Sequence, residues 1–219
     1  MSTIAFSTDP AGAIVTISDL IEEIRDEMDD SGFALSRIYR AITRAEAQFN
    51  RELRVPQMET ELQFMVTQEA TDLPPDFLQM RSIYREGSPD RPLEAMSPEG
   101  LRTLYRGQAG QPAAYALENR RIVVAPVGDA PLTMLYYALI PPLTDVNQSN
   151  WLLVEYPDLY LHQVLAILFA KIGDTDRAAT NLGIATALIE RANAAGRAAR
   201  WGSSPLTPLL VKQVRGARM

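Results

Sequence analysis

The stretch "NQSNWLLVEYPDLYLHQVL", residues 147–165, decides how the chain is organised. Before it, short apolar runs alternate with polar residues, and after it apolar residues recur every three or four positions. Pro157 suits the first position of a helix, and Asp158 favours the positive end of the helix dipole. The stretch therefore predicts a junction where a β-rich segment returns to helices, with three aromatic residues packed between sheet and helices: Trp151, Tyr156 and Tyr160.

The only histidine of the chain, His162, lies in this stretch beside Leu161 and Leu165. A catalytic imidazole would need a nucleophile, yet the sequence has no G-x-S-x-G elbow. A packed or hydrogen-bonded structural histidine is the favoured interpretation.

Beyond the junction the sequence predicts two antiparallel helices that end near residue 200. Gly173 ends the first helix, and Asp174 is placed to cap the second. Their apolar stripes are Leu161, Val164, Leu165, Leu168, Phe169 and Ile172, then Ala178, Leu182, Ala185, Leu188, Ile189 and Ala192.

The N-terminal part predicts two more helices, over 18–32 and 33–54, after an irregular arm. Ser18 or Asp19 can cap the first helix, with Glu22 at capping-box spacing. The second carries an apolar stripe of Leu35, Ile38, Ile42, Ala45, Phe49 and Leu53. Its other face carries Arg37, Arg40, Arg44, Glu46 and Arg51, which are either ordinary surface charges or, less favoured, phosphate contacts.

Between these helical parts the period changes to that of strands. Strands are predicted over 61–67, 78–86 and 132–140, and a hairpin over 113–126 that turns at Glu118–Asn119. Ser97 and Pro98 open a short helix. The strand over 132–140 is apolar on both faces, so its own chain or a neighbouring subunit must cover both. The predicted core or subunit contacts are Leu135, Tyr137, Leu139, Trp151, Tyr156 and Tyr160.

The fold class that follows is α+β, mainly an α-helical bundle with an inserted β-rich segment and an extended C-terminal arm. Residues 1–56 and 146–200 supply the bundle, 57–145 the insertion and 201–219 the arm. The arm mixes apolar and basic residues, and the chain from Arg191 onward holds six basic residues and no acidic one. The 15 basic and 27 acidic residues before Arg191 leave an acidic body. A basic end on an acidic body indicates a nucleic-acid contact, a segment that docks on an acidic neighbour, or a solvated terminus.

Composition narrows the possible chemistry. The chain has no cysteine, which fits maturation in a reducing cytoplasm, and one histidine, so thiolate and histidine metal clusters are not expected. There is no phosphate-binding glycine motif, so no cofactor is predicted. No stretch approaches the length of a membrane span, and the start lacks the basic region of a secretory signal. No catalytic residue stands out, although paired carboxylates keep a carboxylate-dependent hydrolase as an alternative.

Six segments in one order carry a family resemblance: "AEAQFNRELR", "LPPDFLQMRSIY", "PLEAMSPEGLRTLY", "GQPAAYALENRRIVVAPVG", "LTMLYYALIPPLTD" and "NWLLVEYPDLYLHQVL". Together they resemble the head-to-tail adaptor (connector) proteins of tailed bacteriophages, particularly those of short-tailed phages. The resemblance covers roughly residues 35–195. It implies a helical bundle with a β-rich insertion, as the residues themselves predict.

The resemblance also implies a structural, non-enzymatic protein of the virion neck, assembled in the host cytoplasm. Such proteins form a ring, typically of twelve copies, beneath the portal protein, prolong the DNA channel without gripping DNA, and carry the next tail or nozzle proteins. They often dock on the portal through a C-terminal segment, which here would be Leu206, Leu209, Leu210, Val211, Lys212, Arg215 and Arg218. A stopper or tail-tube component is the alternative within the same class.

Overall fold

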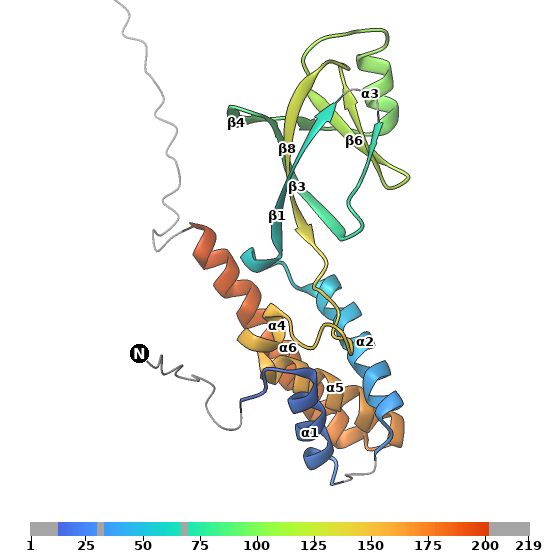
Figure 1. The fold of residues 1–219 in the computed structure, drawn as a ribbon, viewed down its shortest axis with the longest axis vertical. Helices are drawn as coiled ribbons and strands as arrows, with labels where there is room; N and C mark the ends of the chain where they lie inside the picture. Colours follow the sequence, from blue (N-terminus) through green and yellow to red (C-terminus); the bar gives the residue numbers. More distant parts are fainter. Residues whose placement is uncertain (1–12, 30–32, 67–69, 202–219) are drawn as a thin grey trace, which may run out of the picture.

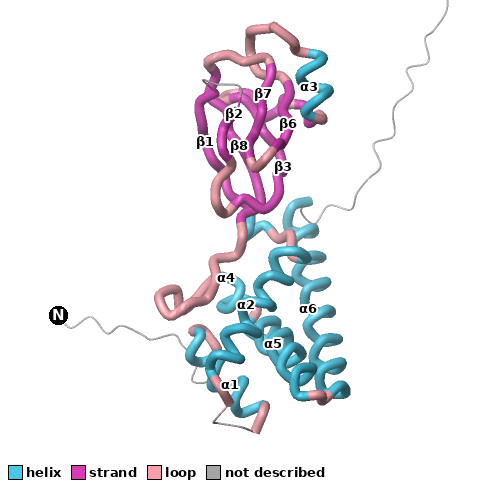
Figure 2. Tube along the Cα trace, turned by 90° about the vertical axis from the view of Figure 1, so that its right-hand side faces the viewer, coloured by secondary structure: helices cyan, strands magenta, loops and turns pink. Residues whose placement is uncertain are grey.

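The computed structural model describes residues 13–29, 33–66 and 70–201. It is elongated, with a helical lobe at one end and a β lobe at the other (Figure 1). The same two lobes are separate in the view turned by 90° (Figure 2). The predicted α+β class is confirmed, because helices from both ends of the chain form one lobe and the strands between them form the other.

Helix α1, Ile17–Glu27, begins at a capping box. The Thr16 hydroxyl accepts a hydrogen bond from the backbone N–H of Asp19, and the Asp19 carboxylate accepts one from the Thr16 N–H at 2.8 Å. The predicted cap at Ser18 or Asp19, with Glu22 reaching back, is therefore wrong. Thr16 is the residue that stays extended while the helix starts behind it, which places Asp19 at the third helical position.

Helix α2, Leu35–Glu52, follows the predicted apolar stripe with two exceptions. Ile38, Ile42 and Phe49 are fully buried, but Leu35 is 46% exposed because it opens the helix beyond the core. Glu46, predicted on the polar face, is buried next to Ala45. Its carboxylate finds partners inside the lobe.

The C-terminal helices are α4, Trp151–Glu155, α5, Pro157–Ile172, and α6, Thr175–Trp201. Asn150 caps α4, and its Oδ1 accepts a hydrogen bond from the Leu153 N–H at 2.9 Å. Pro157 opens α5 as predicted. Gly173 ends α5 in the left-handed region at φ 87°, which a residue with a Cβ rarely adopts, so the chain reverses there into α6.

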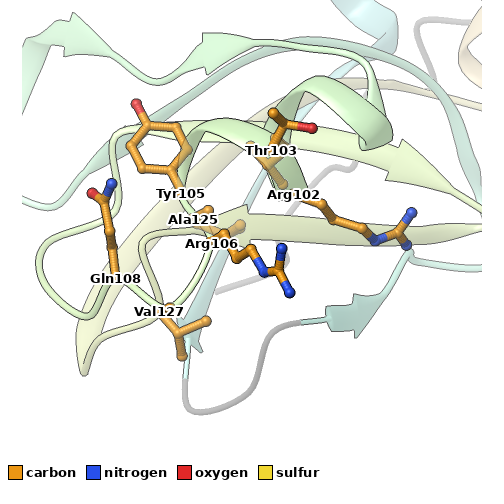
Figure 3. Close-up of a pocket in the computed structure, with 10 residues that line it drawn as sticks. Arg102, Thr103, Tyr105, Arg106, Gln108, Ala125 and Val127 are labelled. Atoms are coloured by element: carbon orange, nitrogen blue, oxygen red, sulfur yellow. The ribbon is translucent and has the colours of Figure 1, made fainter.

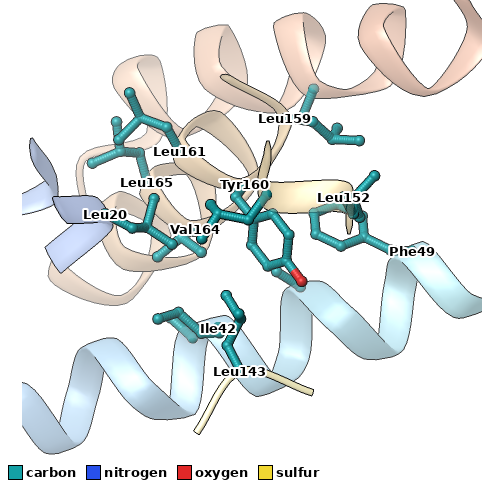
Figure 4. Packing of buried hydrophobic residues seen from close by; sticks show 14 of the residues in the cluster. Leu20, Ile42, Phe49, Leu143, Leu152, Leu159, Tyr160, Leu161, Val164 and Leu165 are labelled. Atoms are coloured by element: carbon teal, nitrogen blue, oxygen red, sulfur yellow. The ribbon is translucent and has the colours of Figure 1, made fainter. Parts of the chain in front are cut away.

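The core of the helical lobe draws on all of these helices. In Figure 4, Leu20 of α1 and Ile42 of α2 approach Val164 and Leu165 of α5. The ring of Tyr160 meets the ring of Phe49 edge to face, with centroids 5.0 Å apart. The two ends of the chain thus share one hydrophobic core, whose burial is the main force that holds this lobe together.

The β lobe consists of two four-stranded sheets. The first has the order β1-β8-β3-β4, with β1 Glu59–Val66, β8 Ala130–Ala138, β3 Phe77–Arg85 and β4 Ser88–Pro92. The second has the order β2-β7-β6-β5, with β2 Ala70–Asp72, β7 Arg121–Ala125, β6 Ala114–Glu118 and β5 Glu94–Ala95. One core contains residues of both sheets, so they pack face to face: Ile83, Leu132, Met134 and Tyr136 with Tyr115, Ile122 and Val124.

Helix α3, Pro98–Leu104, covers the outer face of the second sheet. Leu101 packs there against Ala114, Ala116 and Val123. The predicted Ser97 cap is confirmed, since its hydroxyl accepts a hydrogen bond from the Gly100 N–H at 3.1 Å.

The β6–β7 hairpin turns at Asn119 and Arg120, one residue later than predicted. Both residues have positive φ, 49° and 59°. Two consecutive left-handed residues match the right-handed twist of the flanking strands, and Glu118 is thereby still paired with Arg121 in the ladder.

Candidate functional site

The two lobes meet at a narrow neck, which is built where α2 passes through the short helix η1, Pro56–Met58, into β1. The C-terminal part of α6 lies against this crossing, because Asn193 forms hydrogen bonds with the chain at the end of α2. The Asn193 Oδ1 accepts a hydrogen bond from the Arg54 backbone N–H at 2.8 Å. Its Nδ2 donates to the Glu52 carbonyl at 2.9 Å.

Two arginines pack against the ring of one tyrosine at the neck. The guanidinium carbons of Arg54 and Arg200 lie 5.8 and 5.3 Å from the centroid of the Tyr137 ring. Arg200 also lies 2.5 Å from the Glu59 carboxylate, which pairs in addition with Arg81 of β3. The end of α6 is thus tied to β1, β3 and β8 by charge as well as by packing.

The approach of α6 to the neck depends on Gly196. A Cβ at this position would lie 2.9 Å from Pro56 Cδ and 3.3 Å from Val55 Cα. The contact of α6 with Val55 and Pro56 therefore requires a residue without a Cβ at position 196.

The residues of β8, and Leu139 directly after it, that are predicted to contact a core or a subunit differ in their burial. Tyr137 is buried in the helical core, Leu135 is half-buried, and Leu139 is 38% exposed. On the opposite face Leu132, Met134 and Tyr136 fill the sandwich core. The chain itself therefore covers one face of β8 completely and the other in part, and a subunit contact at Leu135 and Leu139 stays a prediction.

The three aromatic residues of the junction lie in the helical lobe, in a core cluster that also includes Tyr137 of β8. Tyr160 is fully buried, and Trp151 and Tyr156 are half-buried against the same core. The residue that joins sheet to helices is Tyr137. This role of Tyr137 could not be identified from the sequence, because it depends on where β8 ends relative to the helices.

A buried polar network lies behind Tyr160. Its hydroxyl donates to the Glu46 carboxylate at 3.3 Å and accepts from Asn150 Nδ2 at 2.8 Å. The Leu143 backbone N–H donates to the same Glu46 oxygen at 2.7 Å. Burial raises the pKa of the Glu46 carboxyl, while these two hydrogen bonds act in the opposite direction. Burial and the nearby Glu46 likewise raise the pKa of the Tyr160 hydroxyl. The network fixes the segment after β8 onto α2.

His162 is half-buried and structural in its contacts. Its Nδ1 lies 2.8 Å from Asn181 Oδ1, which joins α5 to α6. No nucleophile or carboxylate is among the described partners of His162. Within residues 13–29, 33–66 and 70–201, no group of three or more His, Cys, Asp or Glu side chains is placed to hold a metal ion.

A concavity of about 700 Å³ lies in the β lobe, between α3 and β7. Figure 3 shows Tyr105 and Gln108 on one side of it and Arg102 and Arg106 on the other. Its lining contains no carboxylate among the described residues, so it offers hydrogen-bond donors rather than an acid–base pair. Arg102 pairs with Glu118 at its edge.

The predicted portal-docking residues lie outside the described residues: Leu206, Leu209, Leu210, Val211, Lys212, Arg215 and Arg218. Their role stays a prediction. Sequence analysis did not identify the neck clamp of Arg54, Tyr137 and Arg200, because it joins three segments that are far apart in the chain. The sequence indicated only that Tyr137, on a strand with two apolar faces, must pack against another part of the chain or a neighbouring subunit.

Comparison with known proteins assigns the chain to a class. A model of the SU10 adaptor protein family matches residues 15–209, which is most of the chain. No curated protein matches. The match identifies the chain as a phage structural adaptor protein.

The chain belongs to the SU10 adaptor protein family. The resemblance to phage head-to-tail adaptors is thereby confirmed at the level of the family. Across the part of the chain that the structure describes, no helix combines the length and the apolar character needed to cross a membrane.

Proposed function

We propose that the protein is a subunit of the head-to-tail adaptor ring of a short-tailed phage. The ring, of twelve copies, docks beneath the portal protein, extends the DNA channel and carries the next tail or nozzle protein. The chain acts there without catalysis. The observation that carries this proposal is the family match over residues 15–209.

The two-lobed shape supports this role, because an adaptor must offer separate surfaces to the components above and below it. The helical and β lobes have separate hydrophobic cores, and the described residues join them at the neck. Each lobe can therefore bind its own partner without rebuilding the other.

We assign portal docking to the arm over 201–219. The family match extends to residue 209, so it includes Leu206 and Leu209 of this arm. Apolar side chains would enter a portal groove, and the basic residues would pair with portal carboxylates. Net charge supports the channel role, since a chain of net charge −6 repels phosphate and lets DNA pass.

The test is a phage in which this gene carries an early stop codon. Electron microscopy is expected to show heads without tails, and particles with complete necks and tails would contradict the proposal. A chain truncated after Trp201 separates the arm from the rest, since it keeps α6 whole. It is expected to lose copurification with the portal protein, and unchanged binding would show that another surface docks.

A further inference from the structure

One surface of the helical lobe carries five cations that form no salt bridge with any residue that the structure describes. We call it the basic surface: Arg37, Arg40, Arg44 and Arg51 of α2 with Lys171 of α5. The α2 positions recur at steps of three, four and seven, so they share one helix face. All five side chains are exposed, and none forms a salt bridge with another described residue.

The pKa of Lys171 reports the same imbalance. Burial lowers it first, and the nearby charges of Arg44, Arg40 and Arg37 lower it further. The charges that lower it all belong to arginines. The cations therefore lie close together, and no described carboxylate forms a salt bridge with them, an arrangement that a bound acidic partner would relieve.

The basic surface includes a shallow groove between α2 and α5, about 490 Å³ in volume. Arg44, Arg51 and Lys171 line it together with four uncharged residues, which are Ala47, Gln48, Ile167 and Ala170. Ile172, next to Lys171, is 52% exposed. Arginines beside exposed apolar area are typical of protein interfaces, whereas a phosphate backbone needs no apolar floor.

Helix α1 presents the complementary charge. Its outer side carries Glu22, Glu23, Asp26 and Glu27, and Asp29 follows at its end. All five carboxylates are exposed, and no described cation forms a salt bridge with them. Leu20 and Ile24 point the opposite way, into the core. We call these five residues the acidic face.

We infer that the acidic face of one copy of this chain binds the basic surface of the next copy. The two patches lie on different helices, and no salt bridge between described residues joins one patch to the other or neutralises either. In such a contact, two different surfaces of the chain bind each other, so a short oligomer has one unoccupied surface at each end. The oligomer closes into a ring when the rotation between neighbouring copies allows it. This inference rests on the proposed function for the ring, and it names the surfaces that join its subunits.

Nucleic acid is the other anion that the basic surface could meet. A ring whose basic surfaces are occupied by its own acidic faces presents neither to passing DNA. The basic surface and the acidic face carry equal numbers of opposite charges. This favours a second copy as the partner, because in an assembly of copies each basic surface is neutralised by the acidic face of a neighbour.

The test reverses charge on each patch separately. R40E/R44E makes the basic surface acidic, and E23R/D26R makes the acidic face basic. Each variant alone is expected to stay monomeric at concentrations where the wild-type chain associates, measured by sedimentation velocity at low salt. An equal mixture of the two is expected to regain association, since each variant then offers the charge that the other lacks. Association of the wild type should weaken severalfold as salt rises from about 50 to 500 mM, since screening shortens the reach of exposed charges.

The matched control is R91E/R120E, which makes the same change of charge on exposed arginines of the β lobe. It is expected to associate like the wild type. Circular dichroism of every variant checks that the chain folds. Association of folded R40E/R44E at wild-type strength would overturn the inference, as would a wild-type chain that stays monomeric throughout.

The inference and the proposed function fail separately. Suppose that phages carrying R40E/R44E alone, and phages carrying E23R/D26R alone, both assemble virions with complete rings. That result would overturn the proposed interface and leave the adaptor role intact. Charge-dependent association of a chain that is absent from the virion neck would support the interface and overturn the adaptor role. Loss of DNA binding by R40E/R44E with unchanged self-association would assign the basic surface to nucleic acid and overturn the inference.

Discussion

Asn193 of α6 holds the backbone of Arg54 at the point where α2 leaves the helical lobe. Its Oδ1 accepts from the Arg54 N–H at 2.8 Å, while its Nδ2 donates to the Glu52 carbonyl. One side chain thus satisfies two backbone groups at the end of α2, where the helix itself no longer can. The last helix thereby fixes the direction in which the chain enters β1.

Removal of this side chain should loosen the neck. N193A leaves the N–H of Arg54 and the carbonyl of Glu52 without their partner, and we expect a loss of about 1–3 kcal/mol in the free energy of unfolding. Urea denaturation measures it. N193D is the matched variant, because it keeps the acceptor for Arg54 and loses only the donor, so its loss should be smaller. Equal losses would mean that the Arg54 contact contributes nothing.

Two glycines of α6 predict opposite effects of the same substitution. G196A places a Cβ against Pro56 and Val55, so we expect destabilisation of about 1–3 kcal/mol. G183A meets nothing within 4 Å, and the gain in helix propensity should stabilise the protein by up to about 1 kcal/mol. Thermal and urea unfolding of both variants measures the difference. Stabilisation by G196A would show that α6 does not approach the neck as described.

The buried Glu46 predicts a pH dependence of stability. Its pKa is raised in the folded state, so the protonated form is favoured there, and stability is lost as pH rises from the unfolded pKa, about 4.3, through the folded one. E46Q keeps an oxygen for the Leu143 N–H without a charge, so the stability of E46Q relative to wild type should increase with pH over that window. Urea midpoints at a series of pH values measure it, and a constant difference would contradict the assignment.

The size of the contribution from this network is tested by truncation. E46A leaves the Leu143 N–H and the Tyr160 hydroxyl without their shared acceptor, and we expect it to destabilise the fold by about 1–3 kcal/mol for each group. Y160F removes only the hydroxyl and keeps the ring against Phe49. A Y160F variant as unstable as E46A would assign the effect to the tyrosine alone.

Trp151 should matter for folding or assembly. It is half-buried against the helical core, and W151A would leave a cavity there at a cost of about 3 kcal/mol. V154A is the control, because Val154 lies on the same short helix and is 54% exposed. Unfolding and sedimentation measurements on both variants are the readout. A W151A chain that folds and associates normally would remove this residue from both roles.

Much of the fold could be predicted because it depends on local pattern. The proline at the start of α5, the glycine at its end and the serine cap of α3 are signals carried within a few residues. The predicted hairpin turn was one residue too early. The observed turn places Asn119 and Arg120 in left-handed conformations, and an arginine does not indicate a left-handed position in the sequence.

What sequence could not predict depends on distant partners. Glu46 has the spacing of a surface residue, and only Leu143 and Tyr160 make its burial possible. The cover of Tyr137 comes from Arg54 and Arg200, whose position depends on how α6 packs. The arginine row of α2 was visible in the sequence, but its lack of balancing carboxylates is a property of the folded surface.

The clamp on Tyr137 sets a route for mechanical force. Arg200 lies one residue before the end of α6, and it holds the aromatic ring of β8 and the first carboxylate of β1. Tension applied to the chain after α6 therefore reaches the sheet within one residue, without passing through the bundle. A pull at that end is therefore transmitted to the β lobe through the contacts of Arg200 with Tyr137 and Glu59.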